Sequence, residues 1–475
     1  MLFQTLHYVI FLILTIGFYW SVPFRFRLHV LGVSSLIFYA SWNMYYVPLL
    51  LLVAGMAWVV GKIFHPSKNR GNLWFGLGIF LLFLPLIFFK YWDWIVENIE
   101  MVSQWIHLPI TLPHQGDYNI ILPVGISFFT FQAVSYAVDI RRNEPEERNP
   151  WRFLTFLSFF PQLIAGPIVR QHELLPQLQK PLLLAKNDSS EALFRILKGI
   201  VKKMLFADVL YQSIISQVFA DPSMFIGLEL WIALYTYTLW IYYDFSAYTD
   251  IAIGSARLFG IHLPENFNRP YTASSVAEFW RKWHLTLSNW VRDYIYYPLG
   301  GAKTDTEWKA YRNIILTMMV IGIWHGASWN FVIYGTLHGS AVAFNRWQRK
   351  RNHRRPGDPF ENKWSWFWRF FITFHFVVLA RILFGTKTLA DAWLYFTHLA
   401  EFSIALPRFY SHSVFALLIL GYAWHFTPKS WTNNWIREKF ISLPAPAQAA
   451  LTIGCTLLCW KLNQNSTIAF AYYQF

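Results

Sequence analysis

Charge is scarce in this chain, and cysteine is almost absent. Asp, Glu, Lys and Arg make up 14% of the 475 residues, whereas hydrophobic residues make up 55% and aromatic residues 20%. A soluble domain carries about 25% charged residues, so the composition excludes an ordinary soluble protein and indicates an integral membrane protein. The two cysteines, Cys455 and Cys459, lie four apart in one apolar stretch and offer neither a disulfide framework nor a metal cluster.

Several catalytic patterns are missing as well. The sequence has no GxSxG elbow, no phosphate-binding P-loop and no cluster of metal ligands, so a soluble-type hydrolase, a nucleoside triphosphatase and a zinc enzyme are unsupported. Residues Met1–Trp20 are apolar but lack the basic start and the small-residue cleavage site of a secretory signal. We therefore expect them to form the first membrane span. We expect no bound metal or cofactor.

Apolar segments recur along the chain and predict an all-α membrane protein with about ten to thirteen spans. Some segments are too short to cross a bilayer alone, so we expect tilted or re-entrant helices among them. No internal repeat is visible, which disfavours an inverted-repeat transporter. The segments are Leu2–Val22, Leu28–Val47, Leu49–Val60, Leu73–Phe89, Ile120–Val138, Phe153–Val169, Ala192–Phe219, Phe225–Tyr243, Ile314–Phe331, Phe331–Phe344, Trp366–Phe384, Val414–Phe426 and Ala447–Leu462.

The basic residues predict the orientation. The formal net charge is +14, but Lys and Arg are scattered between apolar segments, which is typical of cytoplasmic loops and not of a nucleic-acid-binding protein. Acidic residues dominate the intervening hairpin between residues 93 and 117, so we expect the N-terminus outside. We interpret the run from Arg346 to Arg355 as a cytoplasmic anchor, in preference to a specific phosphate or coenzyme A site. The early basic residues are Arg25, Arg27, Lys62, Lys68, Arg70, Arg141, Arg142 and Arg148.

Two histidines in apolar surroundings are candidate catalytic residues. His325 follows the run Ile314–Trp324, and His284 lies in the sequence EFWRKWHLTLSNWVRD. An imidazole at bilayer depth is costly, so it is a functional-site hypothesis by default. The alternative is a packed histidine that donates to a backbone carbonyl.

The stretch 273–301 breaks the hydrophobic pattern. Its apolar residues recur at three- and four-residue intervals, which predicts one amphipathic helix carrying His284, begun by Ser274 or Ser275. A helix of this kind can lie at the membrane interface. Its basic residues Arg281 and Lys282 are candidates for contact with the phosphates of a donor, although a solvated helix face explains them nearly as well.

Upstream, four polar residues stand close together between apolar runs. Asp244, Ser246, Tyr248 and Asp250 predict either a buried network that orients a catalytic histidine or a helix end at the interface. The following LPENFNRP, bracketed by Pro264 and Pro270, predicts a non-helical segment.

Six separated blocks resemble the membrane-bound O-acyltransferase superfamily, and most of all its bacterial branch that O-acetylates polysaccharides such as alginate and peptidoglycan. They keep the family's order, and the most family-specific core is 120–345. Ala247 and Thr249 depart from the branch by small-for-small changes. The blocks are LPVGISFFTFQAVSYAVDI (122–140), FFPQLIAGPIVR (159–170), YDFSAYTDIAIG (243–254), LPENFNRPY (263–271), EFWRKWHLTLSNWVRDYIYYPLGG (278–301) and IWHGASWNFVIYGTLHG (323–339).

The resemblance implies roles for individual residues. His325 matches the family's near-universal catalytic histidine, and His284 matches the second active-site position. His338 resembles a third recurring histidine, for which a structural role is at least as well supported. We expect Trp324 and Asn330 to support the site. The implied fold is a single domain, 1–475, in which tilted and re-entrant helices form a ring around a central funnel.

The implied function is a membrane O-acetyltransferase of the bacterial inner membrane. It would take an acyl group from a cytoplasmic thioester, acetyl-CoA or another acyl donor, and pass it to an extracytoplasmic partner protein that modifies a polysaccharide. Histidine suits this chemistry as a general base or as a transient acyl carrier, and the sequence does not separate the two. Transfer of D-alanine or of a longer acyl chain is an alternative, and a polytopic transporter is an alternative of another class. The C-terminal TIAFAYYQF is either an aromatic anchor or a part of acyl relay or partner docking.

Overall fold

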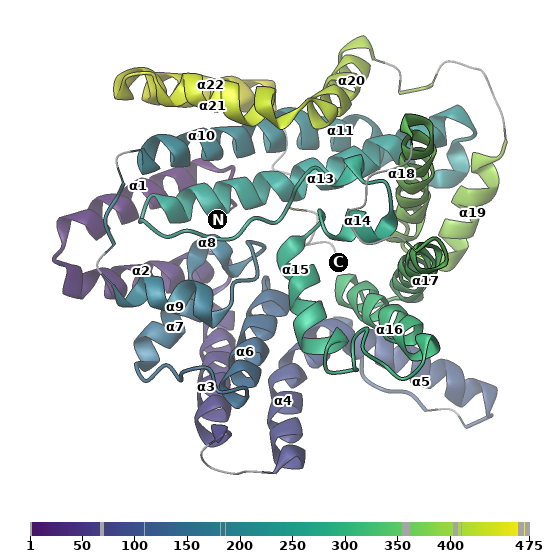
Figure 1. Cartoon of the computed structure of the whole chain (residues 1–475), viewed down its shortest axis with the longest axis horizontal. Helices are drawn as coiled ribbons and strands as arrows, with labels where there is room; N and C mark the ends of the chain where they lie inside the picture. The colour runs from purple at the N-terminus through teal and green to yellow at the C-terminus, as the bar shows by residue number, and fades with distance from the viewer. Residues whose placement is uncertain are drawn as a thin grey trace. The chain divides into compact units, whose positions relative to one another are not determined.

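A computed structural model of the chain describes residues 2–66, 71–108, 110–180, 182–185, 187–353, 362–401, 407–409, 411–463 and 470. Within these ranges every regular element is helical, so the predicted all-α class is confirmed (Figure 1). The described residues group into two compact units: residues 1–186 with 255–264, and residues 187–254 with 265–475.

The first unit holds the helices α1 to α9. Their bounds are α1 Leu6–Ser21, α2 Phe24–Ala40, η1 Met44–Tyr46, α3 Val47–Ile63, α4 Asn72–Leu86, η3 Ile87–Tyr91, α5 Trp92–Trp105, η4 Gln115–Tyr118, α6 Ile126–Arg141, α7 Pro150–Ser158, α8 Phe160–Leu163 and α9 Gln171–Gln179. Helix α3 packs on α6, and α2 packs on α7.

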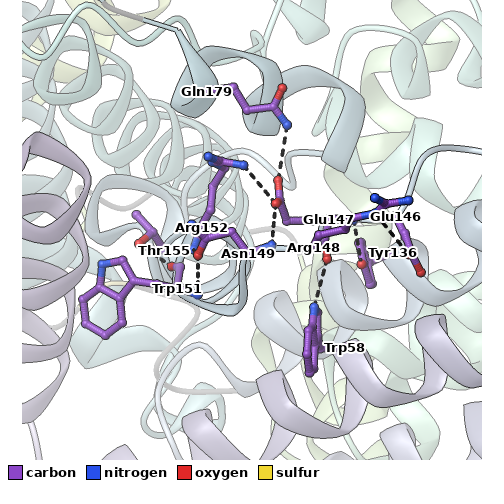
Figure 2. A network of polar contacts seen from close by, with 10 residues as sticks. All are labelled: Trp58, Tyr136, Glu146, Glu147, Arg148, Asn149, Trp151, Arg152, Thr155 and Gln179. Carbon is purple, nitrogen blue, oxygen red and sulfur yellow. Dashed lines mark hydrogen bonds and ion pairs between the residues drawn. The ribbon is translucent and has the colours of Figure 1, made fainter. Parts of the chain in front are cut away.

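A buried glutamate ties four of these helices together. The side chain of Glu147 accepts hydrogen bonds from Arg152 of α7 at 2.9 Å and from Gln179 of α9 at 3.3 Å (Figure 2). Its backbone N–H donates to the hydroxyl of Tyr136 on α6, and its carbonyl accepts from the indole of Trp58 on α3. The loop after α6, which we predicted as a basic cytoplasmic loop, is therefore ordered by a paired carboxylate.

The second unit holds the remaining helices. Their bounds are α10 Asp188–Ile200, η5 Val201–Ala207, α11 Asp208–Leu210, η6 Tyr211–Ile215, α12 Ser216–Val218, η7 Pro222–Met224, α13 Leu228–Arg257, η8 Pro270–Thr272, α14 Val276–Trp280, α15 Leu285–Val291, η9 Arg292–Tyr296, α16 Glu307–His325, α17 Trp329–Arg351, α18 Lys363–Gly385, α19 Leu389–Leu399, α20 His412–Phe426, η10 Ser430–Trp435, α21 Ile436–Ile441 and α22 Ala445–Leu462. The last three residues of α13 group with the first unit.

Three described helical segments are long and apolar enough to cross a membrane: Met44–Ile63, Asn72–Trp105 and Lys363–Gly385. Leu6–Ser21 and His412–Phe426 are shorter apolar helices. The other segments that we expected to span form helices that are shorter, more polar or interrupted. Residues 192–219, for example, include two π-helical stretches, η5 and η6.

Helices α16 and α17 form a hairpin with direct backbone contact. A side-chain carbon added to Gly322 of α16 would lie 2.1 Å from the carbonyl oxygen of Phe331 and 2.9 Å from the Cα of Gly335 on α17. The two helices approach this closely only because both positions are glycine. This contact lies three residues before His325 and therefore holds the end of α16 in place.

Candidate active site

His325 is the last residue of α16. Its side chain is buried, and its ring lies 5.0 Å from Trp324 and 5.0 Å from Phe384 of α18, measured between ring centroids. The next residue, Gly326, ends the helix in an extended conformation and packs against the ring of Phe331, where a side chain would clash. The imidazole is therefore held in an aromatic, water-poor environment at a helix end.

His284 lies in a break between two short helices, which corrects the prediction of one amphipathic helix over 273–301. α14 ends at Trp280 and α15 begins at Leu285. His284 has φ +42°, in the left-handed region, and is fully buried, so it does not lie on a solvent-facing surface.

The non-helical segment after Pro264 explains the break. The backbone carbonyl of Asn266 accepts the N–H of Leu285 at 2.9 Å, and its side-chain oxygen accepts the hydroxyl of Thr286 at 2.7 Å. These bonds replace the helical hydrogen bonds that a continuous helix would make. Residues 263–269 are non-helical, as predicted, and Pro270 begins the short helix η8.

Ser275 begins α14, as predicted, because its hydroxyl accepts the N–H of Glu278 at 3.1 Å. The Glu278 side chain reaches back to Ser274 and not to Ser275. Burial alone would raise the pKa of Glu278, but hydrogen bonds from Lys282 and Ser274 lower it below its ordinary value. The ammonium of Lys282 is thereby occupied, at 2.7 Å from Glu278.

The indole of Trp324 touches both candidate histidines. Its ring centroid lies 5.0 Å from that of His325 and 5.7 Å from that of His284. Phe245 also packs on the His284 ring, at 4.7 Å. The two predicted catalytic residues, although 41 positions apart in the sequence, thus share one aromatic neighbour.

His338 and Asn330 both lie on α17 and are buried. His338 is fully buried and packs 4.4 Å from Tyr334, whose ring lies 6.3 Å from that of His325. Asn330 donates to the backbone carbonyl of Thr386 at 2.9 Å and so joins α17 to the end of α18.

Arg381 of α18 is a further candidate site residue, which we did not predict from the sequence. It is 1% exposed, lies over the rings of Trp283 and Phe384 at 4.7 and 5.2 Å, and donates to the hydroxyl of Tyr334 at 3.4 Å. The signal was available, because an arginine inside the apolar segment Trp366–Phe384 is as unusual as a histidine.

The four polar residues of α13 lie inside this helix and are buried. Asp244 accepts from Lys203 at 2.7 Å, while Asp250 binds Lys202 at 2.8 Å, Arg195 at 3.0 Å and Lys198 at 3.1 Å. Ser246 also accepts from Lys202, at 3.1 Å, and Tyr248 stacks on Phe470. The carboxylates therefore bind lysine and arginine side chains of one neighbouring helical run.

Those basic partners were also missed. Arg195, Lys198 and Lys202 recur at three- and four-residue intervals within a segment that we classified only as apolar. That spacing places them on one helix face and could have predicted a carboxylate partner.

Two cavities flank the segment that begins at Leu285, and Leu285 lines both. The first, which we call the arginine cavity, has a volume of about 520 Å³. The second, which we call the lysine cavity because Lys198, Lys202 and Lys429 line it, has a volume of about 330 Å³. The arginine cavity is lined by Arg281, Arg292, Arg346 and Arg349 together with apolar residues of α16 and α17. Arg281 therefore lines a cavity, whereas Lys282 is not among the lining residues of either one. No group of three His, Cys, Asp or Glu side chains suited to a metal ion occurs in the described part of the chain.

Comparison with known proteins identifies the family. The chain is 34% identical over 398 residues to a probable alginate O-acetylase of Azotobacter vinelandii, covering 83% of this chain and 76% of that protein. It is 34% identical over 400 residues to a peptidoglycan O-acetyltransferase of Helicobacter pylori, covering 76% and 71%. A teichoic acid D-alanyltransferase of Bacillus subtilis is 29% identical over 384 residues, covering 77% and 88%.

The profile of the membrane-bound O-acyltransferase family matches residues 34–385, a range that contains every candidate site residue named above. The transporter alternative therefore gives way to an acyltransferase. The chain belongs to the membrane-bound O-acyltransferase family.

Proposed function

We propose that this acyltransferase takes an acetyl group from a cytoplasmic thioester, such as acetyl-CoA, and passes it across the membrane for O-acetylation of a polysaccharide outside. A partner protein on the far side would complete the transfer. The relatives named for alginate and peptidoglycan acetylation support this acceptor class. We further propose that both compact units belong to one catalytic domain, because the family match spans residues of both.

The observation that carries the proposal is the path along α16. Ile314, Thr317, Met318 and Ile321 line the arginine cavity at intervals of three and four residues, and His325 follows one turn later on the same face. From Ile314 to His325 the helix rises about 16 Å. A donor that enters this cavity with its thioester leading would approach His325 along an apolar wall.

The arginine side chains that line the arginine cavity suit the phosphates of such a donor. Arg281, Arg346 and Arg349 line the same cavity, and burial, together with the positive charges of Arg281 and Arg346, lowers the pKa of Arg349. Arg346 shares Glu307 with Lys350. A bound phosphate group would relieve the repulsion among these positive charges, since guanidinium groups bind phosphate oxygens in pairs. We therefore assign contact with the donor phosphates to Arg281, Arg346 and Arg349. We assign to Lys282 the role of holding the Glu278 side chain in place.

The chemistry follows from the two histidines. His325 would remove the proton of the acceptor hydroxyl or carry the acetyl group itself, and His284 would polarise the thioester carbonyl. In both routes the carbon–sulfur bond of the thioester breaks. The acetyl carbon then bonds to the acceptor oxygen, or first to the histidine nitrogen, and the thiol departs with a proton.

We propose that the protein resides in a bacterial inner membrane with its N-terminus outside and the arginine cavity on the cytoplasmic side. The charge distribution of the loops supports this orientation. A reporter fused near Arg142 should then show cytoplasmic activity and one near Asp117 external activity, and the opposite pattern would refute the orientation.

The function itself is tested with purified protein and radiolabelled acetyl-CoA. We expect release of coenzyme A that is lost in His325→Ala, and an increase in the KM for acetyl-CoA with a retained kcat in Arg281→Gln. Turnover with a D-alanyl carrier protein and none with acetyl-CoA would favour the second candidate, D-alanyl transfer, which the relative of that name supports. Turnover with neither donor would overturn both.

A further inference from the structure

The lysine cavity holds far more positive than negative charge. Its charged lining residues are Arg195, Lys198, Lys202, Arg269 and Lys429 on one side and Asp250 and Glu265 on the other. The side chains of Lys198 and Lys202 are only 22% and 11% exposed. Buried charges need partners of opposite sign, because taking a charge out of water is costly.

The two carboxylates do not balance this charge. Asp250 forms ion pairs with all three of Arg195, Lys198 and Lys202. Glu265 forms a second ion pair with Arg195. Arg269 uses its guanidinium on the backbone carbonyls of His425 and Phe426. One carboxylate shared by three cations leaves room, in charge and in geometry, for a further anion.

A buried histidine points to the same conclusion independently. His425 lines the lysine cavity, is 2% exposed, and finds no hydrogen-bond partner for either ring nitrogen among the described residues. Tyr242 holds the ring edge-on at 4.6 Å, and Tyr271 packs beside it at 5.1 Å. A buried polar group without a partner is rare and calls for an explanation, which a bound ligand with acceptor oxygens supplies.

We propose that the lysine cavity binds a phosphorylated small molecule. Lys198, Lys202 and Lys429 would contact its phosphate oxygens, and His425 would donate one N–H to the same group. Phosphate fits better than carboxylate because its oxygens point in three directions, toward several donors at once. The cavity volume of about 330 Å³ exceeds the space of a few water molecules, so an organic group accompanies the phosphate. The site is additional to the arginine cavity of the donor path proposed above and is lined by other charged residues.

Direct binding to the full-length protein tests this site. Isothermal titration in a detergent without phosphate would use three probes: inorganic phosphate, adenosine 3′,5′-bisphosphate for the nucleotide of coenzyme A, and glycerol 3-phosphate for a lipid headgroup. The probe that binds most tightly shows whether the phosphate belongs to a free ion, a nucleotide or a lipid headgroup. Tight binding of any of the three supports a phosphate site.

Two variants separate binding from folding. Lys198→Gln leaves Asp250 with Arg195 and Lys202, and His425→Phe keeps a ring against Tyr242 without an N–H. Each should weaken the bound probe about tenfold or more. Lys309→Gln, which removes an exposed lysine paired with Asp305, should leave binding unchanged. Unaltered gel-filtration profiles would show that the variants fold. Binding of no probe to the wild-type protein, or equal binding by all variants, would overturn the proposal.

Discussion

Trp280 donates its indole N–H to Nδ1 of His338 at 3.2 Å. An indole can only donate, so Nδ1 is the acceptor and the proton of a neutral His338 lies on Nε2. This bond fixes one tautomer and one ring orientation. His338 in turn packs on Tyr334, which neighbours His325. His338 therefore links Trp280 of α14 to Tyr334, a ring neighbour of His325.

His325→Ala should reduce acetyl transfer by at least about 100-fold, because a general base or acyl carrier would be lost. One buried ring against Trp324 and Phe384 should cost the fold only a few kcal/mol. Initial rates of coenzyme A release at matched expression, with gel filtration as the folding control, measure both effects. Normal activity in a well-folded variant would refute the catalytic assignment.

Substitutions of His284 should separate side-chain chemistry from backbone strain. Asn keeps a hydrogen-bond donor and tolerates the positive φ at this position, Gly tolerates the φ without a donor, and Ala has neither property. We expect activity to fall in the order His284→Asn, His284→Gly, His284→Ala, with every variant more active than His325→Ala. If His284→Asn is as inactive as His325→Ala, His284 must exchange a proton during turnover, and the polarising role is wrong.

Gly322→Ala should impair activity from outside the site. The added methyl group would meet the carbonyl of Phe331 and the backbone of Gly335, so α16 must move at a point three residues before His325. Displacement of a catalytic group by about 1 Å can cost up to about 100-fold in rate, so we expect a loss of about tenfold or more. Gly454→Ala, on α22 with no atom within 4 Å of the added carbon, is the matched control. Equal activity in the two variants would show that the hairpin contact does not position His325.

Lys203→Met should destabilise the protein. The ammonium lies 2.7 Å from Asp244 and 2.8 Å from Asp208, and both carboxylates are fully buried. Removing the shared cation from buried carboxylates costs about 3–5 kcal/mol. The melting temperature in detergent should fall, and adding Asp244→Asn should restore part of the loss. A double variant no more stable than Lys203→Met would contradict this account.

The sequence was sufficient for the class of protein and for the two central histidines as candidates. Composition and apolar segments predict a helical membrane protein, and the block resemblance predicts the family that the comparisons show. Apolar spacing failed at His284, because it cannot reveal a break that depends on Asn266, a partner 18 residues upstream. Only the fold brings that carbonyl to the N–H of Leu285.

Two other buried polar residues could have been predicted from the sequence but were not. Arg381 and His425 each stand inside an apolar segment, where the rule applied to His325 applies equally. The pairing of Asp250 with Lys198 and Lys202, by contrast, needs two helices from different parts of the chain, so spacing could predict the basic face but not its partner. Of the C-terminal TIAFAYYQF (467–475), for which we predicted an aromatic anchor or a part in acyl relay or partner docking, residues 467–469 and 471–475 lie outside the described residues. Phe470 packs on Phe245 and Tyr248.

The glycine contact between α16 and α17 also restricts how the enzyme can move during turnover. Gly335 lies against the carbonyl of Met318, and Gly339 lies against the Cα of Ile315, so the two backbones touch over more than one turn. A slide of one helix along the other by a single residue would push a side chain into space that only glycine leaves open. His325 therefore travels with the whole hairpin as a rigid body, and any gate that admits a substrate has to open through motion of the elements packed around it.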